Sequence, residues 1–245
     1  MRPPFRLDEA GGRKRIGVVL FDEDVTTEDD LAALRAGADD VAVAVARMPL
    51  PLDHSPAGLE RAGADLAAAG ATLAPSARLA AVCYSCTTGT LELGVLRVAE
   101  ALALGRPGVP AATPITGAVK ALATLSATRI SLVTPYPDEL TALIVDYLAG
   151  SGVAVVRRAA LEVGSEMDFE RVDAASLAAA ARAAMAPDAQ ALFVSCSALR
   201  ATPLIAALEA ELGVPVLTST QAMWWEALDL AGARRRGPGR IFALR

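Results

Sequence analysis

The sequence predicts an α/β fold in which parallel sheets are covered by helices. Short apolar segments alternate with Ala- and Leu-rich helical patterns along the whole chain, and this alternation is typical of strand–helix–strand units. Eight of the apolar segments have the length and the β-branched content of buried parallel strands. They are residues 15–21, 41–48, 78–85, 109–114, 129–135, 153–160, 191–196 and 214–219.

Helical patterns fill the segments between the predicted strands. The first helix is expected to begin with Thr26 or Thr27 as its N-cap, because acidic residues follow in what would be its first turn. Trp224 and Trp225 are expected on the last helix, one buried against the sheet and the other at its edge. The clearest helical patterns end in glycine, at residues 137–152 and 202–213.

Composition and charge argue against several classes of protein. With 245 residues, of which 53% are hydrophobic, the chain is long enough for two lobes that share one interface. Its net charge of −5 argues against a nucleic-acid partner, which requires a clustered basic face. The apolar runs end before the ~18 residues of a membrane-spanning helix, and the first residues lack the apolar stretch of a signal peptide. We therefore expect a cytoplasmic protein with no membrane partner.

Two of the three cysteines stand at matching places. In "RLAAVCYSCTTGT" and in "QALFVSCSALRAT", an apolar strand runs into a Ser-Cys pair, and Thr or Ser residues and a helical pattern follow. Cys86 and Cys196 are thus expected at the carboxyl ends of two strands, where open α/β sheets carry their sites. The helix after Cys86 is expected to begin near Leu91. Backbone N–H groups at such a place favour an anion, either the thiolate or a substrate carboxylate.

The residues are compatible with three roles for the cysteines: a redox pair, a metal site, or two thiols that act together in catalysis. Cys83 lies inside the apolar run, so it is more typical of a small buried hydrophobe than of a redox partner for Cys86. A metal site would need more ligands than three cysteines and the single His54 supply, and no metal is expected. His54 also lies in an unrelated loop, which disfavours a Cys–His pair. Two thiols that act together, one as base or nucleophile and one as acid, need no imidazole, and we favour this hypothesis.

Five landmarks in the right order resemble one family. They are the opening strand and loop "RIGVVLF…TTE", "CTTGT" at 86–90, "LVTPY" at 132–136, "SCSALR" at 195–200 and "GVPVLTSTQAMWWEAL" at 213–228. Together they resemble the aspartate/glutamate racemase superfamily, in its maleate cis-trans isomerase and arylmalonate decarboxylase family. The leader "RPPFRLDEA" is most similar to the ectoine-utilisation branch of that family, EutA.

The resemblance implies two Rossmann-like lobes related by a pseudo-twofold axis, with the active site between them. One lobe would hold residues 1–112 and 217–245, and the other residues 113–216. The family needs no cofactor, and its decarboxylases keep only the second cysteine. The presence of both therefore implies an isomerase or racemase of a small carboxylate, with Cys86 as nucleophile or base and Cys196 as acid or base. A homo-oligomer remains an alternative to a monomer.

The resemblance also implies which groups bind the substrate. Hydroxyl and backbone N–H groups around the two cysteines would hold its carboxylate. The same Thr and Ser residues are also ordinary helix caps, and the two roles are compatible. The implied substrate-binding residues are Thr87, Thr88, Tyr136, Ser197, Thr26 and Thr220.

The chain departs from the isomerase pattern where that pattern has asparagines. Asp-Val-Thr-Thr stands at residues 24–27 in place of Ser-Asn-Thr-Thr, and Thr220 replaces a second asparagine. The first-loop acids Asp22, Glu23 and Asp24 would repel a dianion if they face the pocket. We therefore expect an amino-acid-like substrate that carries an amine, such as a product of ectoine breakdown. Maleate isomerase proper, a decarboxylase and a non-catalytic binding relative remain alternatives.

Overall fold

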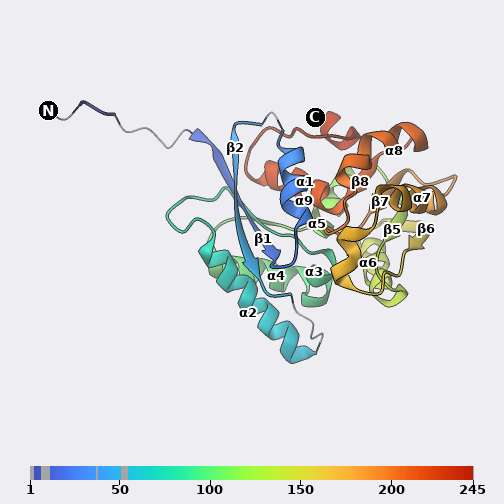
Figure 1. Ribbon diagram of the computed structural model, residues 1–245, viewed down its shortest axis with the longest axis horizontal. Coiled ribbons are helices and arrows are strands. Elements are labelled where there is room, and N and C mark those ends of the chain that lie inside the picture. The colour runs from blue at the N-terminus through green and yellow to red at the C-terminus, as the bar shows by residue number, and fades with distance from the viewer. Residues whose placement is uncertain (1–2, 7–11, 37, 51–54, 245) are drawn as a thin grey trace.

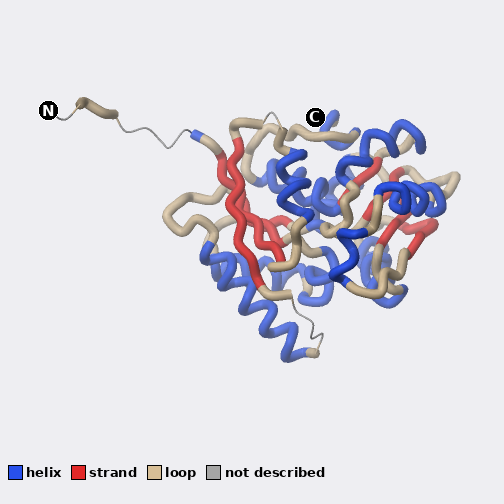
Figure 2. The backbone as a smooth tube through the Cα atoms, in the orientation of Figure 1, coloured by secondary structure: helices blue, strands red, loops and turns tan. Residues whose placement is uncertain are grey.

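The computed structural model describes residues 3–6, 12–36, 38–50 and 55–244, and its core is two four-stranded sheets in which all neighbouring strands are parallel. Figure 2 shows the strands as two groups. The first sheet has the order β2-β1-β3-β4, formed by β1 (Lys14–Phe21), β2 (Val41–Met48), β3 (Ala81–Tyr84) and β4 (Ala111–Ala112). The second has the order β6-β5-β7-β8, formed by β5 (Arg129–Thr134), β6 (Ala154–Ala160), β7 (Ala191–Val194) and β8 (Val216–Thr218).

The predicted α/β class with parallel sheets is confirmed, and all eight predicted strands are present. Some are shorter than their apolar runs, because only part of the run pairs with a neighbour. Of residues 109–114, for example, only Ala111 and Ala112 pair with β3. Both sheets repeat one strand order along the chain, so β3 and β7 are corresponding strands. Cys86 and Cys196 each follow one of them, two residues after its end.

Helices cover both faces of the first sheet. Along β1, the side chains of Ile16, Val18 and Leu20 pack with α1 (Thr26–Leu34) and α9 (Ser219–Leu230). Val19 and Phe21 point the other way and pack with α2 (Pro56–Thr72) and α4 (Val95–Gly105). This alternation follows from the two-residue period of a strand. Each fully buried Val, Leu or Ile side chain contributes about 1.5–3 kcal/mol.

A single hydrophobic cluster surrounds the second sheet. It contains side chains from α5 (Pro114–Thr124), α6 (Asp138–Gly150), α7 (Ala174–Ala184) and α8 (Ile205–Leu212). The predicted glycine stop is present after α8, where Gly213 takes the left-handed conformation with φ +74°. None of the described helices is long and apolar enough to cross a membrane.

Helix α9 joins the two halves of the molecule. Figure 1 shows α9 and α5 in the middle, between the two sheets. Met223 and Trp224 pack into the cluster of the first sheet, whereas Ala222 and Trp225 pack into that of the second. The expectation that one tryptophan lies at an edge is therefore wrong: Trp224 is 1% exposed and Trp225 is 4% exposed, because each ring fills a different core.

Two predicted helix starts are also wrong. Helix α1 begins at Thr26, but its cap is the Asp24 carboxylate, which accepts from the backbone N–H groups of Thr26 at 3.0 Å and Thr27 at 2.8 Å. The third helix, α3 (Thr87–Leu93), begins directly after Cys86 rather than near Leu91. Cys86 is itself the N-cap residue, so its thiol lies at the helix start.

Candidate active site

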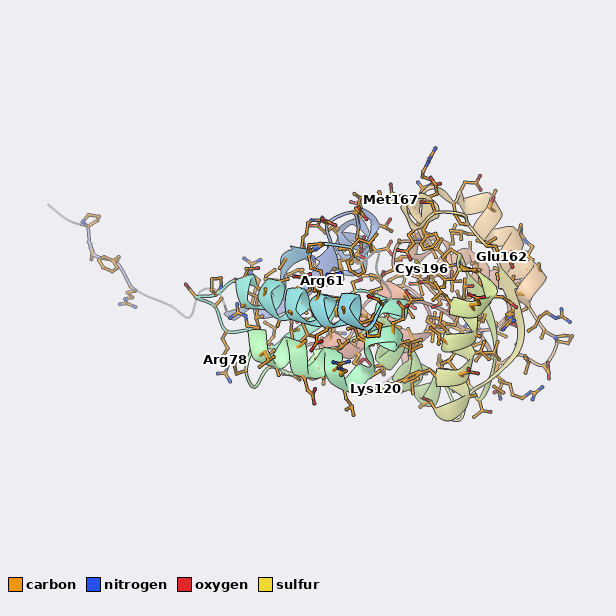
Figure 3. The ribbon with its side chains drawn as sticks, turned by 90° about the horizontal axis from the view of Figure 1, so that it is seen from below. Arg61, Arg78, Lys120, Glu162, Met167 and Cys196 are labelled. Carbon is orange, nitrogen blue, oxygen red and sulfur yellow. The ribbon has the colours of Figure 1, made fainter. Side chains whose placement is uncertain are left out.

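A cavity of about 90 Å³ lies where the carboxyl ends of both sheets meet. The first half of the molecule contributes residues from the loops after β1, β2 and β3, and the second half contributes residues from the segments after β5, β6 and β7. Figure 3 shows Cys196 with Met167, another lining residue, above it. The lining residues are Phe21, Glu23, Asp24, Leu50, Ser85, Cys86, Thr88, Tyr136, Glu166, Met167, Phe169, Glu170, Cys196, Ser197 and Ala198.

Cys86 reaches the cavity from the start of α3. Its Sγ accepts a hydrogen bond from the Gly89 N–H at 3.2 Å and lies 3.8 Å from Thr88 Oγ1. Burial raises the pKa of the Cys86 thiol to about 11, which outweighs the lowering by these two hydrogen bonds. Nearby Glu166 and Glu92 raise it further. The expected preference for an anion at the helix start is thus present but weaker than the cost of desolvation.

Cys196 reaches the cavity from the turn after β7. Its φ of +143° lies in a region that favours glycine, so the backbone here is strained. Burial raises the pKa of the Cys196 thiol to about 12, although hydrogen bonds from the Tyr136 hydroxyl and the Ala198 N–H lower it. Negative charge on Cys86 raises it too. Ionisation of Cys86 therefore keeps Cys196 protonated.

Ser219, the first residue of α9, ties the two cysteine segments together. Its Oγ accepts from the Cys196 backbone N–H at 2.9 Å and lies 2.9 Å from Thr87 Oγ1. Ser197 adds a second link, because its hydroxyl donates to the Ser85 carbonyl at 2.8 Å. These buried hydrogen bonds fix both thiols relative to each other.

The predicted binding residues divide into two groups. Thr88, Tyr136 and Ser197 line the cavity with the two cysteines. Thr26, Thr87 and Thr220 are buried in the described structure but are not among the lining residues, and their side chains bond within the protein. The Thr26 hydroxyl donates to the Ala198 carbonyl at 3.1 Å, Thr87 meets Ser219, and Thr220 hydrogen-bonds Asp30. Binding by these threonines stays a prediction.

Carboxyl groups form part of the cavity wall. Glu23 and Asp24 come from the first loop, as expected, whereas the loop acid Asp22 accepts from the Leu50 N–H at 3.3 Å and is not among the lining residues. Burial raises the pKa of the Asp24 carboxyl, against the lowering by its hydrogen bonds with Thr26 and Thr27. Among the described lining residues there is no Lys, Arg or His.

The sequence reasoning missed a third source of lining residues. Glu166, Met167, Phe169 and Glu170 lie on η2 (Glu166–Arg171), a short 3₁₀ helix after β6. Its six residues are too few to show a helical period. The available signal was Ser165, whose hydroxyl caps η2 by accepting from the Met167 N–H at 3.3 Å.

The other two uses of the cysteines can be compared with the structure. Cys83 is fully buried in the first sheet and burial raises the pKa of its thiol, as expected of a small core residue. Among the described residues, no group of three or more His, Cys, Asp or Glu side chains is placed to hold a metal ion. His54 lies outside the described residues.

Comparison with known proteins points to one family. A family model described as arylmalonate decarboxylase matches residues 95–242. The arylmalonate decarboxylase of Bordetella bronchiseptica is 32% identical over 140 residues, a match that spans 55% of this chain and 58% of that protein. The maleate isomerase of Nocardia farcinica is 29% identical over 221 residues, which is 86% of this chain and 87% of that protein.

Solved structures agree with this fold. A serine mutant of the Nocardia farcinica maleate cis-trans isomerase, with a covalently bound succinylcysteine intermediate, has a TM-score of 0.84 at 27% identity, covering 94% of this chain and 98% of that one. An arylmalonate decarboxylase structure has a TM-score of 0.77 at 25% identity, covering 94% of this chain and 100% of that one.

Proposed function

This chain belongs to the arylmalonate decarboxylase family, and we propose that it is a cofactor-independent isomerase or racemase of a small carboxylate that works through two cysteines. One observation carries the proposal: Cys86 and Cys196, which follow corresponding strands of the two sheets, face the same cavity. The succinylcysteine in the Nocardia farcinica maleate isomerase supports a role for a cysteine that adds to substrate.

The two thiols take different roles because their surroundings differ. Cys86 is the N-cap residue of α3 and its Sγ accepts from the Gly89 N–H, so it acts as nucleophile or base. Cys196 stays protonated and acts as the acid. In a racemisation, the Cys86 thiolate would take the α-proton and the Cys196 thiol would give its proton to the opposite face. In a cis-trans isomerisation, Cys86 would add to one alkene carbon while Cys196 protonates the other, and elimination after rotation would return both groups to their starting state.

The charge of the cavity favours a substrate that carries an amine. Glu23, Asp24, Glu166 and Glu170 would repel a dicarboxylate dianion but attract an ammonium group. Thr88, Ser197 and Tyr136 offer hydroxyl donors for a single carboxylate. We therefore propose an amino-acid-like substrate. The similarity of the leader to the ectoine-utilisation branch makes a product of ectoine breakdown the narrower proposal.

Proton exchange in deuterium oxide tests this function. Amino acids related to diaminobutyrate, incubated with the protein and followed by proton NMR, should lose their α-proton signal. Cys86→Ser should abolish this exchange, whereas Cys196→Ser should abolish racemisation and leave exchange by Cys86 on one enantiomer. Cys83→Ala is the matched control, because Cys83 is buried in the sheet and does not line the described cavity. Absence of exchange with every such compound would exclude the amino-acid racemase. Conversion of maleate to fumarate would then establish the isomerase, and release of carbon dioxide from a malonate the decarboxylase.

A non-catalytic binding protein is the second candidate, and the raised pKa values of both thiols favour it. Iodoacetamide labelling, read at each cysteine by mass spectrometry across pH, separates the two. An enzyme should show one thiol with an apparent pKa below the ~8.5 of a free cysteine once a suitable amine-bearing substrate analogue is bound. A binding protein should show two slow thiols with and without ligand.

A further inference from the structure

Tyr84 is the last residue of β3 and carries a buried hydroxyl outside the proposed chemistry. The side chain is fully buried, and its ring packs edge-on against Phe21 at 5.8 Å between centroids. Among the described residues, Tyr84 Oη has no hydrogen-bond partner. Buried tyrosine hydroxyls normally have one, so this group calls for an explanation.

The nearest place for a partner is beside Cys86. A Cβ atom on Gly89 would lie 2.5 Å from Tyr84 Oη and 3.0 Å from Cys86 Sγ, so both atoms pack against the same side of this glycine. The Gly89 N–H already donates to this sulfur at 3.2 Å. Tyr84 itself is not among the residues that line the described cavity, so it does not touch a substrate bound there.

We propose that Tyr84 is a positioning residue that stabilises the thiolate of Cys86, with its hydroxyl turning to donate to Sγ when the thiol ionises. The inference rests on the proposed function in one respect, namely that Cys86 is the thiol that ionises. A neutral thiol is a weak acceptor and a thiolate a strong one, which explains why the hydroxyl is unpaired beside the protonated form.

The surroundings make this donor useful. Burial and the carboxyl groups of Glu166 and Glu92 all oppose ionisation of Cys86, whereas the Gly89 N–H and the Thr88 hydroxyl support it. Burial holds the pKa of Tyr84 well above its usual range, and the charge of an ionised Cys86 and a hydrogen bond to it raise that pKa further, so the hydroxyl keeps its proton at every working pH.

Cys196 shows what such a pairing achieves. The Tyr136 hydroxyl bonds to Cys196 and lowers the pKa of that thiol. Each cysteine would then have its own tyrosine.

The test is the pH profile of iodoacetamide labelling at each cysteine in three single variants. The chain has three tyrosines, so the series is complete. Tyr84→Phe should raise the apparent pKa of Cys86 and slow its labelling about tenfold at pH 7.5, the effect of one lost hydrogen bond to a charged group. Tyr136→Phe should act on Cys196 instead. Tyr147→Phe, on α6 and outside the described cavity lining, should change neither.

Stability separates a positioning role from a structural one. Because the Tyr84 hydroxyl is unpaired in the resting protein, Tyr84→Phe should leave the melting temperature unchanged or higher while it slows Cys86. Gly89→Ala is the second variant, since its methyl group would clash with Oη, push the hydroxyl away from Sγ and so should also slow Cys86.

Two results would overturn the inference: an unchanged Cys86 profile in Tyr84→Phe, or equal slowing of both cysteines with a lower melting temperature. A wild-type Cys86 that labels only near pH 11, even with ligand, would contradict the proposed function. The comparison between wild type and variant would still decide the role of Tyr84.

Discussion

Replacing Ser219 by alanine should damage the site more than the fold. The Ser219 hydroxyl serves two buried partners, the Cys196 N–H and the Thr87 hydroxyl, each at 2.9 Å. Alanine removes the hydrogen-bond partner of both groups, and each buried polar group left unpaired lowers the free energy of unfolding by about 1–3 kcal/mol. We expect the free energy of unfolding to fall by about 3 kcal/mol. In a chain of this length the melting temperature should then drop by about 6–12 °C.

The effect on the site should exceed this loss of stability. A non-glycine residue at the strained φ of Cys196 costs about 1–3 kcal/mol, and the Ser219 hydrogen bond is one contact that holds it there. Without that bond the turn can relax and carry Sγ away from the Tyr136 hydroxyl and the Ala198 N–H. We expect the apparent pKa of Cys196 to rise and turnover to fall at least tenfold, measured well below the melting temperature.

Ser131→Ala is the matched control. Ser131 is also fully buried and accepts from one backbone N–H, that of Ala186 at 3.0 Å, but it lies on β5 away from the described cavity lining. This variant should lose about 1–2 kcal/mol in urea unfolding and keep its turnover and its Cys196 labelling profile. If both variants lose turnover in proportion to stability, Ser219 has no special role at the site and the reasoning fails.

Two further predictions concern stability. Gly117→Ala places a Cβ 2.3 Å from the Ala222 carbonyl oxygen, where α5 meets α9, so it should lower the free energy of unfolding by about 2 kcal/mol. Gly63→Ala lies in an open part of α2 and should instead raise the free energy of unfolding by about 0.5–1 kcal/mol. Equal unfolding free energies for these two variants would contradict the close helix contact. Burial raises the pKa of the Asp30 carboxyl to about 6, above the ~3.9 of the unfolded chain. The folded state therefore holds this proton more tightly, and the Asp30 contribution to stability should rise by about 2 kcal/mol as pH falls from 7.5 to 4. Asp30→Asn should remove that contribution, which urea unfolding at both pH values measures. Equal changes in the free energy of unfolding of wild type and variant between the two pH values would disprove the assignment.

The sequence predicted the parts of this fold that follow from local pattern. Residues 41–48 coincide with the observed β2, because alternating Val and Ala residues favour an extended strand; that this strand lies at the edge of the sheet, with Val45 exposed, is not visible in the run. The matching cysteines were also placed well, since both stand directly after such a run. A strand end is a property of neighbouring residues, so it can be found without the tertiary structure.

The missed features depend on contacts that the pattern does not contain. Asp24 caps α1 from two positions ahead of the first helical residue, so a search for a cap at the expected boundary selected Thr26 or Thr27. The acids of η2 reach the cavity because Phe169 anchors that short helix against the Tyr136 ring, at 5.4 Å between centroids. That ring contact joins residues on either side of α6 and β6, and no local period signals it.

The charge of the cavity and of any ligand bound in it determines how easily Cys86 ionises. Nearby positive charge stabilises a thiolate, and the described lining offers carboxyl groups instead. An ammonium group about 4 Å from Sγ would contribute about 4 kcal/mol at the effective dielectric of a partly buried site, enough to lower a thiol pKa from about 11 to about 8. A dicarboxylate would raise it. If the proposed function holds, an amine-bearing substrate would supply the missing cation, and Cys86 would ionise only when that substrate is bound. Labelling of Cys86 should accordingly accelerate with a saturating unreactive amino acid and slow with succinate, and the opposite order would show that the substrate is a dianion after all.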